Sequence, residues 1–511
     1  MTGDRGPAIP RSFPAPAQGL EASRLRWLGA LLLLTILRLA VAAATPLSPD
    51  ESYYWVWSRA LAPGYLDHPP MVALWIRGGT ALLGPDPLGI RLLAPIGAAL
   101  GSVLLYRAAR DLPEPVSDPA EAHRRGVVAA ALLNSTLLLG IGSVIITPDT
   151  PLLVFVTAAW WALGRALRSG HTGWWLLCGF LLGLALDSKY TAALPGAGFA
   201  AWLLLSRPGR RWMRVPGPWL AGAAALLSFM PVVWWNATHG WASFLKQGGR
   251  SDDWHPARAA QFLGELMGGQ LGLATPLLFL MLVAGMAEAL RRARRPGADG
   301  GGGWSLCCWL VLLPVAVFLQ HALGGRVQAN WPGLIYPAAM LPTAAVAAQV
   351  RWGRFWPQAA GLGAAMTLLV YAQSATALLP LPRKLDVTLQ RLGGWTDLAT
   401  AAASRTDGFL VADEYGLASE LAHALPGRAV FGMEPRWRLF SLPHGLPPPS
   451  EEGLLVRSAR RNEPPDPQPW SELEPAGELV RARDGREAER YRLFRVRFRA
   501  LPTDTAVARL P

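Results

Sequence analysis

Long runs of apolar residues recur through the first three quarters of the chain, separated by short polar segments. Each run holds roughly twenty residues, and a helix of that length, rising ~1.5 Å per residue, spans the ~30 Å hydrocarbon core of a membrane. We therefore predict eleven to thirteen transmembrane helices. The apolar stretches lie near residues 26–46, 88–109, 124–146, 150–167, 173–187, 190–206, 216–236, 262–290, 304–323, 331–350 and 355–378.

The arginines divide the loops between these stretches into two sets. Alternating loops on one side hold sixteen arginines in 53 residues, whereas the loops of the other side hold seven lysines or arginines in 80 residues. Loops on the cytoplasmic side of a membrane are enriched in Lys and Arg. We therefore place the arginine-rich loops in the cytoplasm and the other set, which includes 46–87 and 237–261, outside.

The two ends of the chain differ from its apolar middle. Residues 1–24 are rich in proline and polar residues, which predicts a disordered cytoplasmic tail. Residues 379–511 contain more charges and prolines and no segment apolar enough to span. Their pattern predicts helices at 395–404 and 415–425 and short strands at 408–412, 454–457 and 491–498. The predicted fold is a polytopic all-α membrane domain over 25–378, followed by a small α/β domain on the outer side.

Composition narrows the class of protein further. Only 16% of the 511 residues are charged, against ~25% in a typical soluble protein. The net charge of +13 resides largely in the short arginine-rich loops, so we predict membrane lipids as partners and no nucleic acid. No phosphate-binding glycine loop and no His/Cys spacing typical of a metal site occurs. We predict no cofactor, and dependence on a divalent metal stays open.

Unusual polar residues gather in the outer loops. Asp50 and Glu51 directly follow the first apolar run, and His68 precedes a Pro-Pro pair in the same loop. Carboxylates at the mouth of a membrane span are costly unless they face water, a partner charge or a substrate. Two structural explanations compete: an interfacial anchor with solvated acids, or a helix N-cap by Asp50.

An enzyme acting on the outer face has no nucleotide sugar at hand. Its activated substrate would have to arrive in the membrane, and a lipid-linked donor with a phosphate leaving group meets that need. Such a site requires a carboxylate base to activate the acceptor and cations to hold the phosphate. Lys189 is a candidate for the phosphate, although it could instead extend to lipid headgroups, with Asp187 as its counter-ion.

Several short motifs follow one another along the chain: 49–55 (PDESYYW), 64–70 (GYLDHPP), 147–151 (TPDTP), 183–191 (GLALDSKYT), 231–241 (PVVWWNATHGW), 330–332 (NWP) and 412–421 (ADEYGLASEL). Together and in this order, they resemble the motifs of bacterial membrane glycosyltransferases of the GT-C fold, related to protein O-mannosyltransferases and lipid A aminoarabinose transferases (glycosyltransferase families 39 and 83). The similarity covers roughly residues 26–430.

The resemblance implies an inverting transfer of one sugar from polyprenyl phosphate to a glycan, lipid or protein acceptor. It implies that Asp50 is the catalytic general base and that Glu51, beside it, shares the catalytic role. The aminoarabinose branch has Lys where this chain has His68, which argues against aminoarabinose as the sugar. We expect Lys189, His68 and Arg326 to bind the donor phosphate. Candidate substrate-binding residues are Tyr53, Tyr54, Asp149, Tyr190, Asn236, His239 and Asn330.

The same resemblance predicts a multi-pass protein of the bacterial cytoplasmic (inner) membrane, with its active site and C-terminal domain in the periplasm. The main alternative is a polytopic transporter or lipid flippase without transferase chemistry. Such proteins often show internal repeats with broken helices in matching halves. No repeat of that kind is evident in the sequence, and the acids crowd on one face, so the enzyme is favoured.

Overall fold

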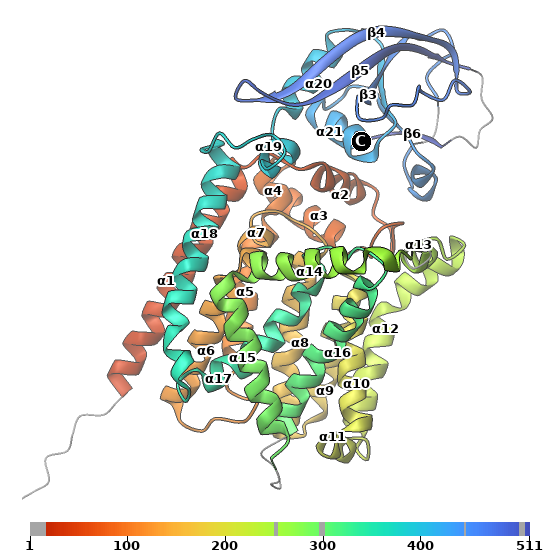
Figure 1. Ribbon diagram of the computed structural model, residues 1–511. Helices are drawn as coiled ribbons and strands as arrows, with labels where there is room; N and C mark the ends of the chain where they lie inside the picture. Colours follow the sequence, from red (N-terminus) through yellow and green to blue (C-terminus); the bar gives the residue numbers. More distant parts are fainter. Residues whose placement is uncertain (1–16, 250–253, 296–301, 444–445, 500–505) are drawn as a thin grey trace, which may run out of the picture.

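A computed structural model describes residues 17–249, 254–295, 302–443, 446–499 and 506–511. Its two parts are a bundle of helices and, at one end of the bundle, a sheet with short helices (Figure 1). The first half of the bundle consists of α1 (Ala17–Ala44), α2 (Pro49–Arg59), α3 (Met71–Leu83), α4 (Pro87–Arg91), α5 (Leu93–Ala108), α6 (Pro119–Asn134), α7 (Leu137–Gly142), α8 (Asp149–Ser169), α9 (Thr172–Leu186), η1 (Tyr190–Ala192) and α10 (Ala193–Leu205).

The second half of the bundle ends near residue 376. It consists of α11 (Arg207–Trp212), α12 (Pro216–Thr238), α13 (Ala242–Gly248), η3 (Pro256–Arg258), α14 (Ala259–Ala274), α15 (Pro276–Ala293), α16 (Gly302–Ala322), η4 (Trp331–Ile335), α17 (Tyr336–Ala347), η5 (Arg351–Phe355) and α18 (Trp356–Thr376).

The described helices confirm a mostly helical membrane-type fold, with fewer full-length spans than predicted. By length and composition five helical segments could cross a membrane, or up to seven if each of two bent pairs counts as one span. Three further apolar helices are shorter than 18 residues. The five segments are Gly19–Ala44, Pro87–Ala108, Asp149–Ser169, Pro216–Thr238 and Gly302–Ala322.

Identifiable residues interrupt the predicted spans. The stretch 262–290 breaks at Thr275, which has a φ of +71° and is followed by Pro276. The chain bends by 103° between the helices on its two sides. The stretch 124–146 breaks after Asn134, and Thr136 caps the start of α7. The stretches 173–187 and 190–206, predicted as separate helices, are separate: Asp187, Ser188 and Lys189 lie between α9 and η1.

The first helix begins earlier than predicted. α1 starts at Ala17, so residues 17–24, assigned to the tail, are helical. The prediction of a disordered tail stopped at the polar residues of this segment, but a helix extends into polar sequence as long as no proline interrupts it. Residues 1–16 lie outside the described part of the chain.

The C-terminal part contains a six-stranded sheet in the order β4-β5-β3-β1-β2-β6. Strand β1 pairs in parallel with β2 and β3, and the outer pairs are antiparallel. Its elements are α19 (Val387–Arg391), α20 (Trp395–Ala403), β1 (Phe409–Ala412), α21 (Tyr415–Ala424), β2 (Val430–Met433), η6 (Pro435–Leu439), β3 (Gly453–Ser458), β4 (Trp470–Arg483), β5 (Arg486–Phe498) and β6 (Val507–Arg509).

All five elements predicted in this part are present, so the prediction of a small α/β region is confirmed. Strands β2, β4 and β6 were missed. Strand β4 lies at the sheet edge, and its Pro475 and Gly477 coincide with a register shift opposite β5. Proline is tolerated at an edge because no second neighbour needs its missing N–H, so a segment that reads as a loop can still be a strand.

The sheet region packs on the bundle through α2 and α21. Tyr53 and Trp57 of α2 contact the ring of Phe440, and Tyr53 also packs edge-on against Trp437. A Cβ atom at Gly416 would come within 2.8 Å of Cβ of Pro49, so only glycine permits this close approach. The first outer loop and the C-terminal region therefore form one contiguous core.

Candidate functional site

The acidic pair that follows α1 begins a short helix. Ser48 is the N-cap of α2: its side chain accepts from the backbone N–H of Glu51, and the Glu51 side chain accepts from the backbone N–H of Ser48. This reciprocal arrangement is a capping box. Asp50 is therefore inside the first turn and has no capping role, which removes one of its two structural explanations.

Glu51 points into the protein and is fully buried with Arg91 of α4. Nε of Arg91 lies 2.6 Å from Oε1 of Glu51, and Nη2 lies 2.8 Å from Oε2. The remaining N–H groups of this guanidinium bond the carbonyls of Ala42, Thr45 and Pro46. All five donors of Arg91 are thereby satisfied.

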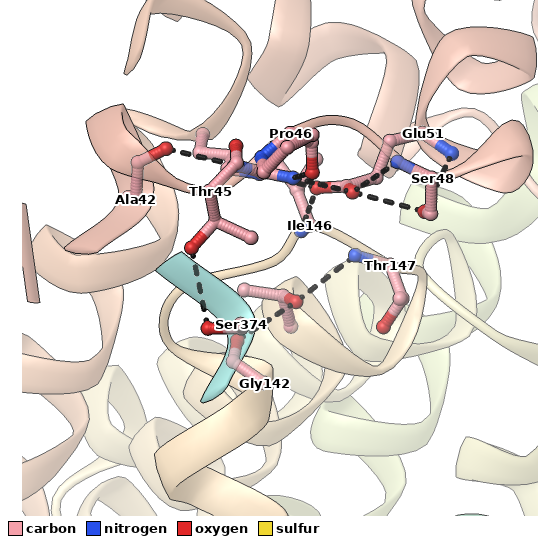
Figure 2. A network of polar contacts seen from close by, with 11 residues as sticks. Ala42, Thr45, Pro46, Ser48, Glu51, Gly142, Ile146, Thr147 and Ser374 are labelled. Carbon is pink, nitrogen blue, oxygen red and sulfur yellow. Dashed lines mark hydrogen bonds and ion pairs between the residues drawn. The ribbon is translucent and has the colours of Figure 1, made fainter. Parts of the chain in front are cut away.

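The same carboxylate also holds the loop before α8. Oε1 of Glu51 accepts from the N–H of Ile146 at 3.0 Å, and Figure 2 shows Glu51 between Ser48 and Ile146. In the same view the hydroxyl of Thr45 lies 3.3 Å from that of Ser374 near the end of α18. One ion pair thus ties together the end of α1, the start of α2, α4 and the loop that leads to Asp149.

These contacts argue against the prediction that Glu51 shares the catalytic role. Burial would raise the pKa of Glu51, but the charge and hydrogen bonds of Arg91 outweigh it and hold that pKa below its usual value. A carboxylate that is enclosed and fully bonded cannot reach a substrate. Glu51 positions its neighbour, and the Ser-Pro-Asp-Glu signature of a capping box was the signal in the sequence.

Beside this network a cavity of about 630 Å³ opens between the bundle and the sheet region. It brings together eight predicted site residues from five separate segments of the chain: Asp50, Tyr53, Tyr54, His68, Asp149, Lys189, Arg326 and Asn330. Side chains that were not predicted as site residues complete the lining, among them Asp67, Gln328 and Tyr415. Glu51, Tyr190, Asn236 and His239 do not line it.

Asp50 is half-buried on the cavity wall. Its Oδ1 accepts a hydrogen bond of 3.1 Å from the hydroxyl of Tyr415 at the start of α21. Burial, together with the charge of Asp50, raises the pKa of Tyr415. The phenol therefore stays protonated and is the donor of this hydrogen bond. Within the described residues no cation pairs with Asp50. Its second oxygen is therefore available to a ligand.

Unlike Asp50, Asp149 is paired with a cation in the same cavity, the side chain of Lys189. Nζ of Lys189 lies 2.7 and 2.8 Å from the two carboxylate oxygens of Asp149. The side-chain amide of Asn330 donates to the same carboxylate at 2.6 Å. Asp149, and not Asp187 as expected, is thus the counter-ion of Lys189. The lysine is held at the cavity, only 8% exposed, instead of extending to lipid headgroups.

Asp67 is a third carboxylate of the cavity, and it is neutralised by two cations. Lys246 lies 2.5 Å from one oxygen and Arg436 of η6 lies 3.1 Å from the other, which also accepts from the hydroxyl of Tyr53. Burial would raise the pKa of Asp67, but Arg436 and Lys246 lower it overall. No pattern in the sequence indicated Arg436, which lies 369 residues from Asp67.

Two further residues predicted to bind the donor phosphate border the cavity. His68 follows Asp67 and lies edge-on to Tyr54, with 6.4 Å between ring centres. Arg326 is 66% exposed and pairs with Glu265 at 2.8 Å. Its side chain therefore lies at the rim of the cavity.

Tyr190, Asn236 and His239 instead stabilise the corner between α12 and α13. The hydroxyl of Tyr190 lies 2.7 Å from that of Ser243, and Asn236 accepts from the N–H of Phe244. His239 stacks on Trp235 and bonds its carbonyl. These contacts hold α13, the helix that carries Lys246, so the three residues support the site from behind without lining the cavity.

The side chains also bear on metal binding. Among the residues that the structure describes, no group of three or more His, Cys, Asp or Glu side chains is arranged to hold a metal ion. Two of the cavity's carboxylates, Asp149 and Asp67, are matched instead by Lys189, Lys246 and Arg436. Dependence on a divalent metal stays an open prediction.

Two sequence comparisons agree with the resemblance recognised in the motifs. Residues 67–235 match the family described as dolichyl-phosphate-mannose-protein mannosyltransferase. The lipid A galacturonosyltransferase RgtD of Rhizobium johnstonii is 27% identical over 300 residues, which are 58% of this chain and 60% of that protein. The chain thus matches about three fifths of the length of this relative.

Solved structures agree over most of the chain. ArnT from Cupriavidus metallidurans bound to undecaprenyl phosphate has a TM-score of 0.60 at 14% identity, covering 92% of this chain and 98% of that one. The archaeal oligosaccharyltransferase AglB from Archaeoglobus fulgidus has a TM-score of 0.50 at 13% identity, covering 79% and 64%. At these identities the structures establish the fold alone. The resemblance to membrane glycosyltransferases of the GT-C fold, and the fold class, are confirmed.

Proposed function

We propose that this GT-C-fold protein transfers a single sugar from a polyprenyl-phosphate donor to an acceptor hydroxyl, with inversion at the anomeric carbon. The observation that carries the proposal is Asp50: it is the carboxylate of the cavity that has no cation partner among the described residues. A general base must be free to accept a proton from the attacking hydroxyl. Asp67 and Asp149 are engaged by lysine or arginine.

The proposed reaction is a single displacement. Asp50 accepts the proton of the acceptor hydroxyl as its oxygen bonds to the anomeric carbon, and the bond from that carbon to the phosphate oxygen breaks. The departing polyprenyl phosphate gains negative charge, which Lys189 stabilises from a nearly buried position, with Arg326 and His68 nearer the cavity rim. The hydrogen bond from Tyr415 keeps the Asp50 carboxylate oriented toward the cavity.

The donor and the acceptor have different support. A polyprenyl-phosphate donor is supported by the lipid-bound ArnT structure, which shares the fold, and by the cations around the cavity. As acceptor we propose lipid A or its attached core glycan, because the relative RgtD is named a lipid A galacturonosyltransferase. Both substrates meet at the outer face of the inner membrane, where the proposal places the cavity.

We expect Lys189→Ala to slow transfer by removing charge stabilisation of the departing phosphate. Loss of one such group in a site shielded from water raises the barrier by about 2–4 kcal/mol. The measurement is turnover of a radiolabelled polyprenyl-phosphate sugar by purified protein in nanodiscs. Lys384→Ala is the matched control, because Lys384 is exposed and outside the cavity. Parental turnover by Lys189→Ala would remove Lys189 from the donor site.

The function as a whole is tested in cells. We expect a deletion strain to lack one hexose, pentose or uronic acid on lipid A or its core, measured by mass spectrometry of the isolated glycolipid. Re-expression of the intact chain should restore the sugar, and re-expression of Asp50→Asn should not. A transporter or flippase would be indicated if Asp50→Asn restored the glycolipid fully while the deletion strain accumulated a lipid intermediate.

A further inference from the structure

A second cavity, of about 680 Å³, lies at the opposite end of the helical bundle. Helix α8 connects the two cavities: Asp149 at its start lines the first, and Arg165 near its end lines the second. Arg165 is sixteen positions after Asp149, which corresponds to ~24 Å along the helix. The second cavity is walled by α1, α5, α6, α8 and α9 on the side of the bundle away from the sheet (Figure 1).

The charges around this cavity are not balanced. Arg24, Arg107, Arg110 and Arg165 line it, and Asp111 is the acid among its lining residues. Asp111 is itself paired, with Arg168 at 2.8 Å and Arg165 at 3.5 Å. In the described part of the chain, Arg24, Arg107 and Arg110 have neither an ion pair nor a side-chain hydrogen bond. Three exposed guanidinium groups thus border one cavity without a counter-ion among the described residues.

The walls of the cavity are aromatic. Trp27 of α1 stacks on Tyr106 of α5 with 4.4 Å between ring centres, and Trp161 packs edge-on against Trp174 at 5.1 Å. Indole and phenol rings favour the level of lipid headgroups, because one end of each ring is apolar and the other is polar. A cavity for a small soluble anion needs no such walls.

An apolar track leads from this cavity into the membrane region. Leu28 lines the cavity, and Leu32 and Ile36 follow it on the same face of α1 at intervals of four residues. These three side chains are 48%, 63% and 54% exposed. Helix α1 is long and apolar enough to span a membrane, and only 17% of its most apolar segment is buried in the protein. Its exposed face is therefore available to acyl chains directly beside the arginines.

We propose that this cavity binds the phosphate headgroup of an anionic membrane lipid, with its acyl chains along the exposed face of α1. Arginine-rich loop ends alone would follow from membrane orientation. Here four arginines converge on one cavity beside an aromatic wall and an apolar track, and three of them have no acidic partner among the described residues. This site is separate from the proposed catalytic cavity, so its lipid is a bound partner and not a donor or acceptor in transfer.

Native mass spectrometry of the full chain tests the proposal. We expect the wild-type protein to retain phosphatidylglycerol in preference to phosphatidylcholine with the same acyl chains. In the double variant Arg107→Gln/Arg110→Gln this preference should fall roughly 30-fold, because two cations that attract the anionic headgroup are lost. The matched control is Arg351→Gln/Arg354→Gln, which removes two exposed arginines with the same spacing outside the cavity. The control should keep the wild-type preference.

Three results would overturn the proposal. The first is equal retention of the two lipids by the wild-type protein. The second is an equal loss in both double variants, which would mean that any surface arginine attracts the lipid. The third is displacement of phosphatidylglycerol by glycerol 3-phosphate at equal concentration, which would assign the cavity to a soluble phosphate. A melting curve for each variant separates loss of lipid from loss of fold.

Discussion

Replacement of Asp50 by asparagine is expected to lower sugar transfer by ~10² to 10⁴ while the protein inserts and folds normally. Asparagine keeps the shape of the side chain and can still accept the hydrogen bond from Tyr415, but it cannot take a proton from the acceptor. The half-buried position at the second residue of α2 makes no cap contact that the amide would break. The loss should therefore be confined to chemistry.

Single-turnover transfer in nanodiscs and binding of the lipid-linked donor, measured side by side, check this expectation. The variant should bind the donor as the parent does and fail to turn it over. Asp397→Asn, an exposed acid of α20, is the matched control and should transfer at the parental rate. Wild-type turnover by a well-folded Asp50→Asn protein would place the base elsewhere in the cavity.

Replacement of Arg91 by methionine is expected to destabilise the folded protein by about 3–5 kcal/mol. Removal of one partner from a buried ion pair leaves the other charge enclosed and uncompensated, and that cost exceeds the worth of the pair itself. Here the change would also strand three backbone carbonyls that Arg91 bonds. Glu51, with no exposed surface, has no route to water.

Unfolding of this variant in mixed micelles of detergent and denaturant gives the measurement. Arg77→Met on α3, an exposed arginine, is the control and should unfold within about 0.5 kcal/mol of the parent. Adding Glu51→Gln to Arg91→Met removes the stranded charge and should recover part of the loss. If Arg91→Met unfolds like Arg77→Met, the ion pair does not hold α1, α2 and α4 together.

The sequence predicted the membrane-type helical fold and half of the residues that line the cavity because these depend on local pattern. Apolar runs of sufficient length indicate helices whatever their surroundings, and the first outer loop carries several polar residues within twenty positions. The count of spans was less well predicted. A run of apolar residues does not show where a helix bends, as it does at Thr275.

The roles of neighbouring residues were harder to predict. Asp50 and Glu51 are adjacent, but successive positions on a helix are rotated by ~100°, so one faces the cavity and the other the core. The partner of Lys189 was assigned to Asp187, two residues away, whereas the fold supplies Asp149 from the start of α8. Proximity in sequence misleads where helices bring distant residues together.

The cavity depends on contacts between the two ends of the chain. Tyr415 bonds Asp50 across 365 residues, and Arg436 pairs with Asp67 across 369. Synthesis proceeds from the N-terminus, so a ribosome has made every helix of the bundle before it reaches either Tyr415 or Arg436. The nascent bundle therefore carries Asp50 and Asp67 before their C-terminal partners exist. It lacks Tyr415, which orients Asp50, and Arg436, which helps to neutralise Asp67. The groups that line the cavity therefore acquire their final geometry only after the sheet region has been synthesised and has packed on α2.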